Sequence, residues 1–420
     1  MGDRKQTLKS LINKILEFSS DYIFVAINQL IQVGSPILVI FILLPRIGKD
    51  YFAEIILITS ISTYFKLLYD FGFDFFGVRR ILISKSDNHK IIVFSGVQGA
   101  KMILVITLII PHFLIGTLLS FEENYLFIIM HILSVALYGF IPFWYFIAFK
   151  VFNHITLINF IAQSIFICLC YFFITDSSLW YLYSSFLFLG QLFAVCFAFI
   201  FLKIKKSIRL SFNIKLSILY LKNSFSLMSF NFLSNIYVSS SVILLKIFGA
   251  STSNITEFGI AEKIIRGIRQ IFTPITKILY PRLVQIKKSN YHLFKRIIFR
   301  LSILLLLFSS IIYILVNVFY EQIYRLLNSN DAIPNNGFLF GIISLIIVIG
   351  TLGGFMSTCY LIVKGLEKVL RNILILASST FLILSYILFG EYGIIGIAIS
   401  LIVAESILLL FNIIYFIRDE

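Results

Sequence analysis

Four charged residues and one threonine recur at helical spacing on one predicted membrane helix. They follow one another at increments of four, three, four and four: Glu262, Arg266, Arg269, Thr273 and Lys277. Because an α-helix has 3.6 residues per turn, this spacing places them on one face. An ionisable group at membrane depth costs at least ~2.5 kcal/mol and usually faces a partner or a watery cavity. The stretch, which also contains Lys263, therefore predicts a cationic stripe along a cavity, with salt bridges between helices as the alternative.

A second apolar stretch carries a sparser version of this pattern. Lys66, Asp70 and Asp74 lie one turn apart, and Arg79 and Arg80 follow where the apolar run ends. Two helices that both present charge favour a hydrated cavity between two bundles. Structural pairing of Asp70 or Asp74 with Lys66 or Arg79 is the alternative. Isolated lysines are expected to snorkel from helix ends: Lys101, Lys246 and Lys364.

Amide side chains occupy two further spans. Asn28 and Gln32 lie one turn apart, and Asn231 and Asn235 repeat this spacing 203 residues later. If they line the cavity, their amides suit a hydroxyl-rich ligand. Hydrogen bonding between helices is an equal alternative.

Four acids are candidates for exchanging protons or Na⁺ with the cavity: Asp70, Asp74, Glu262 and Glu405. There is no glycine-rich phosphate loop, so direct ATP hydrolysis is not expected. The four cysteines lie in apolar segments without the spacing of a metal site, and the five histidines form no motif. We therefore expect neither a cofactor nor a bound metal, apart from a coupling ion.

The elements that must position these residues are membrane helices. The 420-residue chain is 59% hydrophobic and only 13% charged, which is typical of a multispanning membrane protein. Windows of ~20 apolar residues, the length needed to cross a bilayer, predict twelve crossings. They cover roughly residues 20–45, 52–78, 91–118, 125–149, 153–174, 179–202, 223–248, 256–281, 297–319, 337–362, 366–390 and 392–416.

Charge in the connectors predicts the orientation. Basic residues gather in alternate connectors, whereas the opposite ones carry only Arg46, Lys49 and Arg325. By the positive-inside rule both termini are cytoplasmic. The net charge of +15 is therefore explained by the membrane surface, and nucleic-acid binding is not expected.

The connector after the sixth crossing divides the chain into two halves of the same orientation, which suggests a parallel repeat. We expect a cytoplasmic amphipathic N-terminus over 1–19, a six-helix lobe over 20–203, a basic cytoplasmic linker over 204–222 and a second six-helix lobe over 223–420.

Short motifs resemble those of a known transporter family. They are Pro45-Arg46-Ile47-Gly48 with Tyr51-Phe52, Asp70-Phe71-Gly72-Phe73 leading to Arg79-Arg80, Pro142-Phe143-Trp144-Tyr145-Phe146, and Tyr280-Pro281. In order and helix count the chain resembles the Wzx-type polysaccharide (O-antigen) flippases of the multidrug/oligosaccharidyl-lipid/polysaccharide exporter superfamily. It departs from them at Ile147-Ala148-Phe149-Lys150, where the family often has Gln-Gly.

The resemblance implies an all-α polytopic protein with twelve transmembrane helices in two six-helix bundles around a V-shaped central cavity. It implies a non-enzymatic transporter in the bacterial inner membrane. Its substrate would be an undecaprenyl-diphosphate-linked oligosaccharide for O-antigen or lipopolysaccharide biosynthesis, flipped to the periplasmic leaflet by alternating access. Membrane lipids, a polysaccharide polymerase and a chain-length regulator are the implied partners. Candidate diphosphate ligands are Arg266, Arg269, Lys277 and Lys263, then Arg79, Arg80 and Lys66.

Two other functions compete with this hypothesis. A multidrug or cation antiporter of the same superfamily would favour an acidic cavity, whereas the charge within these spans is net basic. A membrane polysaccharide polymerase would need a large extramembrane loop or an acidic catalytic motif, and the sequence shows neither.

Overall fold

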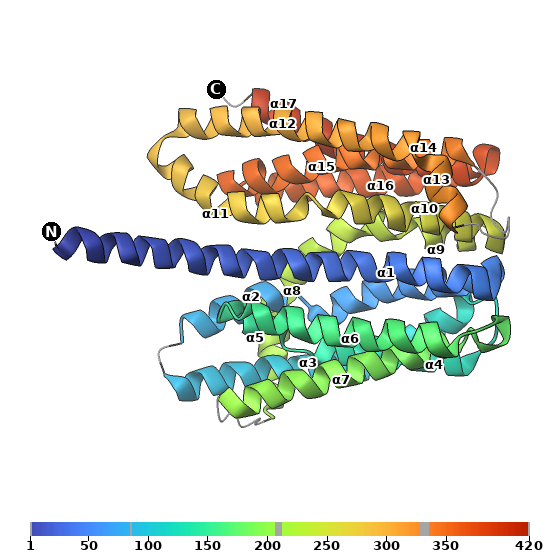
Figure 1. Ribbon diagram of the computed structural model, residues 1–420, viewed down its shortest axis with the longest axis horizontal. Helices are drawn as coiled ribbons and strands as arrows, with labels where there is room; N and C mark the ends of the chain where they lie inside the picture. The colour runs from blue at the N-terminus through green and yellow to red at the C-terminus, as the bar shows by residue number, and fades with distance from the viewer. Residues whose placement is uncertain (1, 85, 206–211, 328–335, 419–420) are drawn as a thin grey trace.

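The computed structural model describes residues 2–84, 86–205, 212–327 and 336–418. Side chains are described from residue 23 on, apart from short stretches, chiefly in α8 and α11. These ranges are helical and contain no strand, and most helices run along the long axis of the molecule (Figure 1). Helices suit a bilayer because they satisfy their own backbone hydrogen bonds.

The first half of the chain begins with a very long helix, α1 (Gly2–Asp70), which contains a sharp break. Gly48 has a φ of 76°, a left-handed conformation that glycine adopts without steric cost, so the two parts of α1 form separate crossings. The helices that follow are α2 (Phe73–Leu82), α3 (Asp87–Leu119), α4 (Tyr125–Phe140), α5 (Phe143–Ala148), α6 (Phe152–Phe173) and α7 (Leu182–Lys205), with a short 3₁₀ turn, η1 (Ser177–Leu179), before α7.

The second half has more interrupted helices. They are α8 (Ile214–Ser239), α9 (Ser241–Ile247), α10 (Thr252–Gln270), α11 (Thr273–Ser289), α12 (Tyr291–Val318), α13 (Tyr320–Leu327), α14 (Gly337–Ser344), α15 (Ile346–Met356), the π-helical η2 (Ser357–Ile362), α16 (Glu367–Tyr392) and α17 (Ile394–Ile417).

The crossings agree with those predicted. Within the described ranges nine helical segments are long and apolar enough to span a membrane, and the first of them, Ile23–Leu82, is broken at Gly48 into two. The more polar pairs α8–α9 and α10–α11 complete the twelve. The prediction of an all-α polytopic membrane protein is therefore confirmed.

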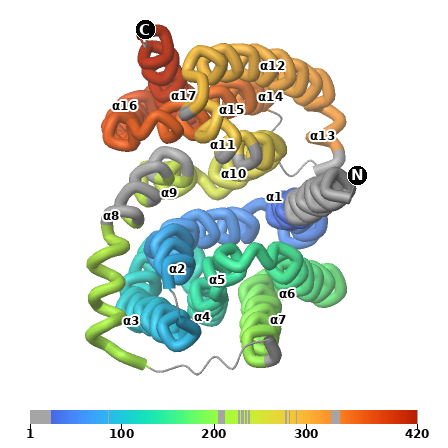
Figure 2. The backbone as a smooth tube through the Cα atoms, turned by 90° about the vertical axis from the view of Figure 1, so that its left-hand side faces the viewer, coloured from blue at the N-terminus to red at the C-terminus, as the bar shows by residue number. Residues whose placement is uncertain are grey.

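The helices form two groups, which we call the first lobe (α1 to α7) and the second lobe (α9 to α17) (Figure 2). Helix α8 connects them, because it packs against α3 in the first lobe and α16 in the second. It begins at Ile214, inside the segment predicted as a linker over 204–222. Helix α1 begins at Gly2, so residues 2–19 are helical and continuous with the helix of the first crossing.

The lobes touch closely at the end of the bundle that holds Gly48, on the right in Figure 1, which we call the Gly48 end. Thr256 of α10 donates a hydrogen bond to the Lys49 carbonyl at 2.7 Å, and Thr252 donates one to Asp50. A Cβ atom at Gly259 would lie 2.5 Å from Ile56 Cγ2. Only glycine lets α10 approach α1 this closely, so the structure is closed at this end.

Candidate functional site

A cavity of about 370 Å³ lies between the lobes. Its walls come from both parts of α1, from α4, α6 and α7 of the first lobe, from the end of α8, and from α9 and α10 of the second lobe. Charged side chains from both lobes line it: Lys66, Glu262, Lys263 and Arg266. Two adjoining hollows, of about 440 and 280 Å³, share Arg266, Gln270 and Gln32 with it. We call the three spaces together the central cavity.

Lys66 is the first-lobe cation of the central cavity. Its side chain is exposed to this space, and Nζ lies 5.3 Å from the centre of the Tyr138 ring. Among the residues that the structure describes, no acid lies within ion-pair distance of it. Lys66 therefore brings an uncompensated positive charge to the cavity.

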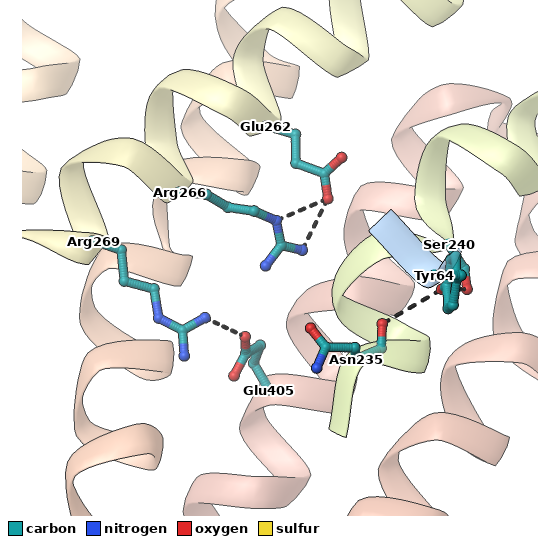
Figure 3. A network of polar contacts seen from close by, with 7 residues as sticks. All are labelled: Tyr64, Asn235, Ser240, Glu262, Arg266, Arg269 and Glu405. Atoms are coloured by element: carbon teal, nitrogen blue, oxygen red, sulfur yellow. Dashed lines mark hydrogen bonds and ion pairs between the residues drawn. The ribbon is translucent and has the colours of Figure 1, made fainter. Parts of the chain in front are cut away.

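Lys263 and Arg266 face the same space from α10. Lys263 Nζ donates a hydrogen bond to Thr59 Oγ1 at 3.2 Å and so connects the two lobes. Arg266 pairs with Glu262, one turn earlier, with Nη2 and Oε1 2.8 Å apart (Figure 3). Because Glu262 offsets the charge of Arg266, the net positive charge of this wall comes from Lys263.

Arg269 belongs to the interior of the second lobe more than to the cavity. Its Nη1 lies 2.7 Å from Glu405 Oε1 (Figure 3). Its Nη2 donates a hydrogen bond to the Gly350 carbonyl at 2.9 Å. Glu405 is completely buried. A Cβ atom at Gly350 would lie 2.7 Å from Arg269 Cζ, so glycine makes room for this arginine. The structure thus places Arg269 in a structural ion pair, with part of its side chain at the cavity edge.

The other predicted diphosphate ligands do not gather here. Arg79 and Arg80 are exposed at the end of α2 and line none of the described cavities. The side chain of Lys277 lies outside the described residues.

The predicted amides are divided between the cavity and helix packing. Gln32 lines the cavity, as does Asn28, which also accepts a hydrogen bond from Asn159 Nδ2 at 2.7 Å. Asn235 contacts Tyr64 through its backbone carbonyl, at 3.4 Å (Figure 3). The side chain of Asn231 lies outside the described residues.

The predicted ion-coupling acids are mostly paired with cations. Besides the two pairs on α10, Asp70 lies 3.6 Å from Lys101 Nζ. Lys101 is only 2% exposed, so the expectation that it snorkels from a helix end is wrong. It is held inside the first lobe because Asp70 offers it a counter-charge. Asp74 lines the hollow beside Asn28.

Several cavity residues were not among the predicted ligands. They are Thr59, His131, Gln163, Tyr183 and Gln270. Gln270 accepts a hydrogen bond from Gln29 Nε2 at 2.5 Å, a further contact between the lobes. Gln163 could have been predicted as a cavity residue in the same way as Gln32, because it is a glutamine inside an apolar span.

Comparison with known proteins gives the fold. No family model matches the sequence, and no curated protein matches it. The chain superimposes on the inward-facing form of a multidrug resistance MATE family transporter of the MOP superfamily with a TM-score of 0.72 and 14% identity, over 93% of this chain and 94% of that one. For the lipid II flippase MurJ in an inward closed conformation the TM-score is 0.73 and the identity 17%, over 92% and 86%. The chain shares the fold of these transporters.

The comparison also distinguishes conformations. An outward-facing MATE family transporter gives a TM-score of only 0.59 at 13% identity, over 95% of this chain and 94% of that one. The chain is therefore closer in shape to the inward-facing form. This agrees with the tight contacts of Thr252, Thr256 and Gly259 at the Gly48 end.

Proposed function

We propose that the protein moves an undecaprenyl-diphosphate-linked oligosaccharide from the cytoplasmic to the periplasmic leaflet of the bacterial inner membrane by alternating access. The observation that carries this proposal is the charge of the central cavity. Lys66 and Lys263 bring two positive charges from opposite lobes, and Glu262 is neutralised by Arg266. Asp74 adds one negative charge in the hollow beside Asn28, so the charged lining residues that the structure describes remain net positive. A cavity of this kind attracts an anion.

The chemistry of the cavity fits a diphosphate linked to sugars. A diphosphate diester carries two negative charges, which match the ammonium groups of Lys66 and Lys263. A buried charge is stabilised only when a counter-charge and hydrogen bonds accompany it. The amides of Gln32, Gln163 and Gln270 provide donors and acceptors for sugar hydroxyls. A polymerase and its chain-length regulator would use the product on the far side.

The direction of transport follows from the charge of the connectors. Basic connectors lie at the end opposite Gly48, which the positive-inside rule assigns to the cytoplasm. With the Gly48 end closed, the conformation described here receives substrate from the cytoplasmic side. The fold is shared with a protein named as a lipid II flippase, which supports a lipid-linked substrate.

A multidrug or cation antiporter is the second candidate, because the fold is shared equally with MATE transporters. Asp74 and Glu262 are the acids that a cationic drug would contact in this cavity. Glu262 already has Arg266 as its partner, and Lys66 and Lys263 would repel a cation. The charge balance therefore favours the flippase.

Deletion of the gene in a strain without a paralogue tests the proposal. Lipid-linked oligosaccharide should accumulate on the cytoplasmic face, and surface glycan should disappear until the wild-type protein is restored. Normal surface glycan in the deletion strain would overturn the proposal. Loss of drug resistance with normal surface glycan would favour the antiporter.

A further inference from the structure

Glu257 is a buried acid of α10 that, unlike Glu262 and Glu405, has no cation paired with it among the described residues. It lies on α10 at the Gly48 end, is 8% exposed, and makes no ion pair among the described residues. One side-chain oxygen accepts a hydrogen bond from the Asn336 side chain, whereas Oε1 has no partner among the described residues. A buried carboxylate with an unsatisfied oxygen is costly in its charged form.

The space around Glu257 suits a proton better than a metal ion. It adjoins a pocket of about 30 Å³ whose lining is mainly apolar, with Asn336, Tyr320 and Tyr324 as the other polar residues. No cluster of three or more acidic, histidine or cysteine side chains that could hold a metal occurs among the described residues. A proton on Oε1 removes the charge and needs no further ligands.

The charged groups that the structure describes near Glu257 on the neighbouring helices do not pair with it, so a proton bound here is assigned to Glu257. On α13, Glu321 pairs with Arg325 at 3.5 Å, and both are largely exposed. Helix α14 contributes no charged group, and across the lobe interface α1 presents Lys49 and Asp50. Glu257 is on the second turn of α10, beyond the first turn where a helix dipole stabilises an anion.

The position of Glu257 connects its protonation to the contact between the lobes. The preceding residue, Thr256, donates the hydrogen bond to Lys49 that helps to close the Gly48 end. When the lobes separate there, water reaches this part of α10 and stabilises the carboxylate. When they close, burial favours the neutral acid.

We propose that Glu257 binds a proton when the Gly48 end closes and releases it when that end opens. The proton adds to carboxylate Oε1 on closing and returns to water on opening, with no other bond made or broken. As a coupling site this inference rests on the proposed function, but the proton-linked movement can be measured without substrate. Acidic pH then favours the closed form, and alkaline pH favours the open form.

Spin labels across the Gly48 end provide the test. Glu123→Cys and Glu391→Cys place labels on exposed positions of opposite lobes, in a background with Cys168→Ser and Cys196→Ser. In lipid nanodiscs without substrate, the distance between labels should increase as the pH rises. Glu257→Gln, which resembles the protonated acid, should keep the short distance at every pH. Glu54→Gln, a change at a second buried acid of this end, should respond to pH as the parent does.

Transport gives the second readout. In proteoliposomes an imposed pH gradient should change the rate of lipid-linked oligosaccharide translocation by the parent and leave that of Glu257→Gln unchanged. A Glu257→Gln protein that still opens with rising pH, or a parent that shows no pH response, would overturn the inference. If the labels respond as expected but no lipid-linked oligosaccharide moves, the proposed function fails and the proton site stands.

Discussion

Two pairs of like-charged residues lie 203 positions apart in the two halves of the chain: Glu54 with Glu257, and Lys66 with Arg269. In the acidic pair the first-lobe member is held by neighbours, and in the basic pair the second-lobe member is. Glu54 in the first lobe accepts hydrogen bonds from the Ser120 hydroxyl and from the amides of Phe121 and Glu122. Glu257, in contrast, keeps one oxygen that has no partner among the described residues. Conversely, Lys66 faces the cavity and has no acid paired with it in the part of the chain that the structure describes, whereas Arg269 is held by Glu405.

The difference shows that residues of like charge, at positions 203 apart, have different surroundings in the two lobes. In each pair one member is fixed by neighbours and stabilises its lobe, and the other keeps its binding capacity. In the two proposals made above, the first lobe offers a cation to the substrate and the second offers an acid to a proton. A site of this kind cannot be recognised from residue type alone, because the members of each pair are chemically alike.

The largest expected effect is a loss of stability when Arg269, the cation paired with Glu405, is replaced. Arg269→Gln leaves Glu405 buried without a partner, which costs about 3–5 kcal/mol. The melting temperature in nanodiscs should fall markedly, and the double change Arg269→Gln with Glu405→Gln should recover much of the loss. Arg325→Gln is the control, because its pair with Glu321 is exposed and contributes at most about 1 kcal/mol. Equal stability of Arg269→Gln and Arg325→Gln would show that the buried pair is not structural.

Replacement of Lys66, the cation that faces the cavity, should weaken substrate binding and not stability. Lys66→Gln removes a charge-assisted hydrogen bond to the diphosphate, worth about 1.5–3 kcal/mol, so affinity for the lipid-linked oligosaccharide should fall roughly tenfold or more. The melting temperature should change little, since Lys66 has no acid partner among the described residues. Lys368→Gln, at an exposed lysine on α16, should bind like the parent. The division of tasks is refuted if Lys66→Gln binds normally but melts early.

Glu54, the acid held by hydrogen bonds from residues 120–122, should contribute less stability than Arg269. Glu54→Gln keeps the shape of the side chain but turns charge-assisted hydrogen bonds into neutral ones, which are roughly half as strong. We expect a loss of about 1 kcal/mol in the free energy of unfolding, seen as a modest fall in melting temperature. An unchanged melting temperature would mean that Glu54 does not hold residues 120–122 in place.

Glu257, the acid proposed to bind a proton, should contribute least to stability. If Glu257 is already neutral in the closed form, Glu257→Gln replaces one neutral group by another of the same shape. The free energy of unfolding at neutral pH should change by no more than about 0.5 kcal/mol. A loss larger than that of Glu54→Gln would indicate that Glu257 is a structural carboxylate.

Helical periodicity predicted the crossings and the face of α10, but not the partners of its charges. Arg266 and Arg269 lie on one broad face, yet one pairs with Glu262 on the same helix and the other with Glu405, which is 136 residues away. The Asp70 and Lys101 pair joins two helices in the same way. Such pairs depend on how helices are rotated against each other, which a single sequence does not specify. Glu257 lay at the edge of a predicted span, where an acid is unremarkable.

Transport by purified protein in proteoliposomes tests whether the central cavity binds a lipid-linked diphosphate. Vesicles would contain a fluorescent undecaprenyl-diphosphate-linked oligosaccharide, with an organic cation offered in parallel. We expect the parent to translocate the lipid, and Lys66→Gln to be at least tenfold slower at low substrate. Lys368→Gln should match the parent, and the cation should be neither moved nor inhibitory. Transport of the cation with the lipid left in place would contradict this expectation.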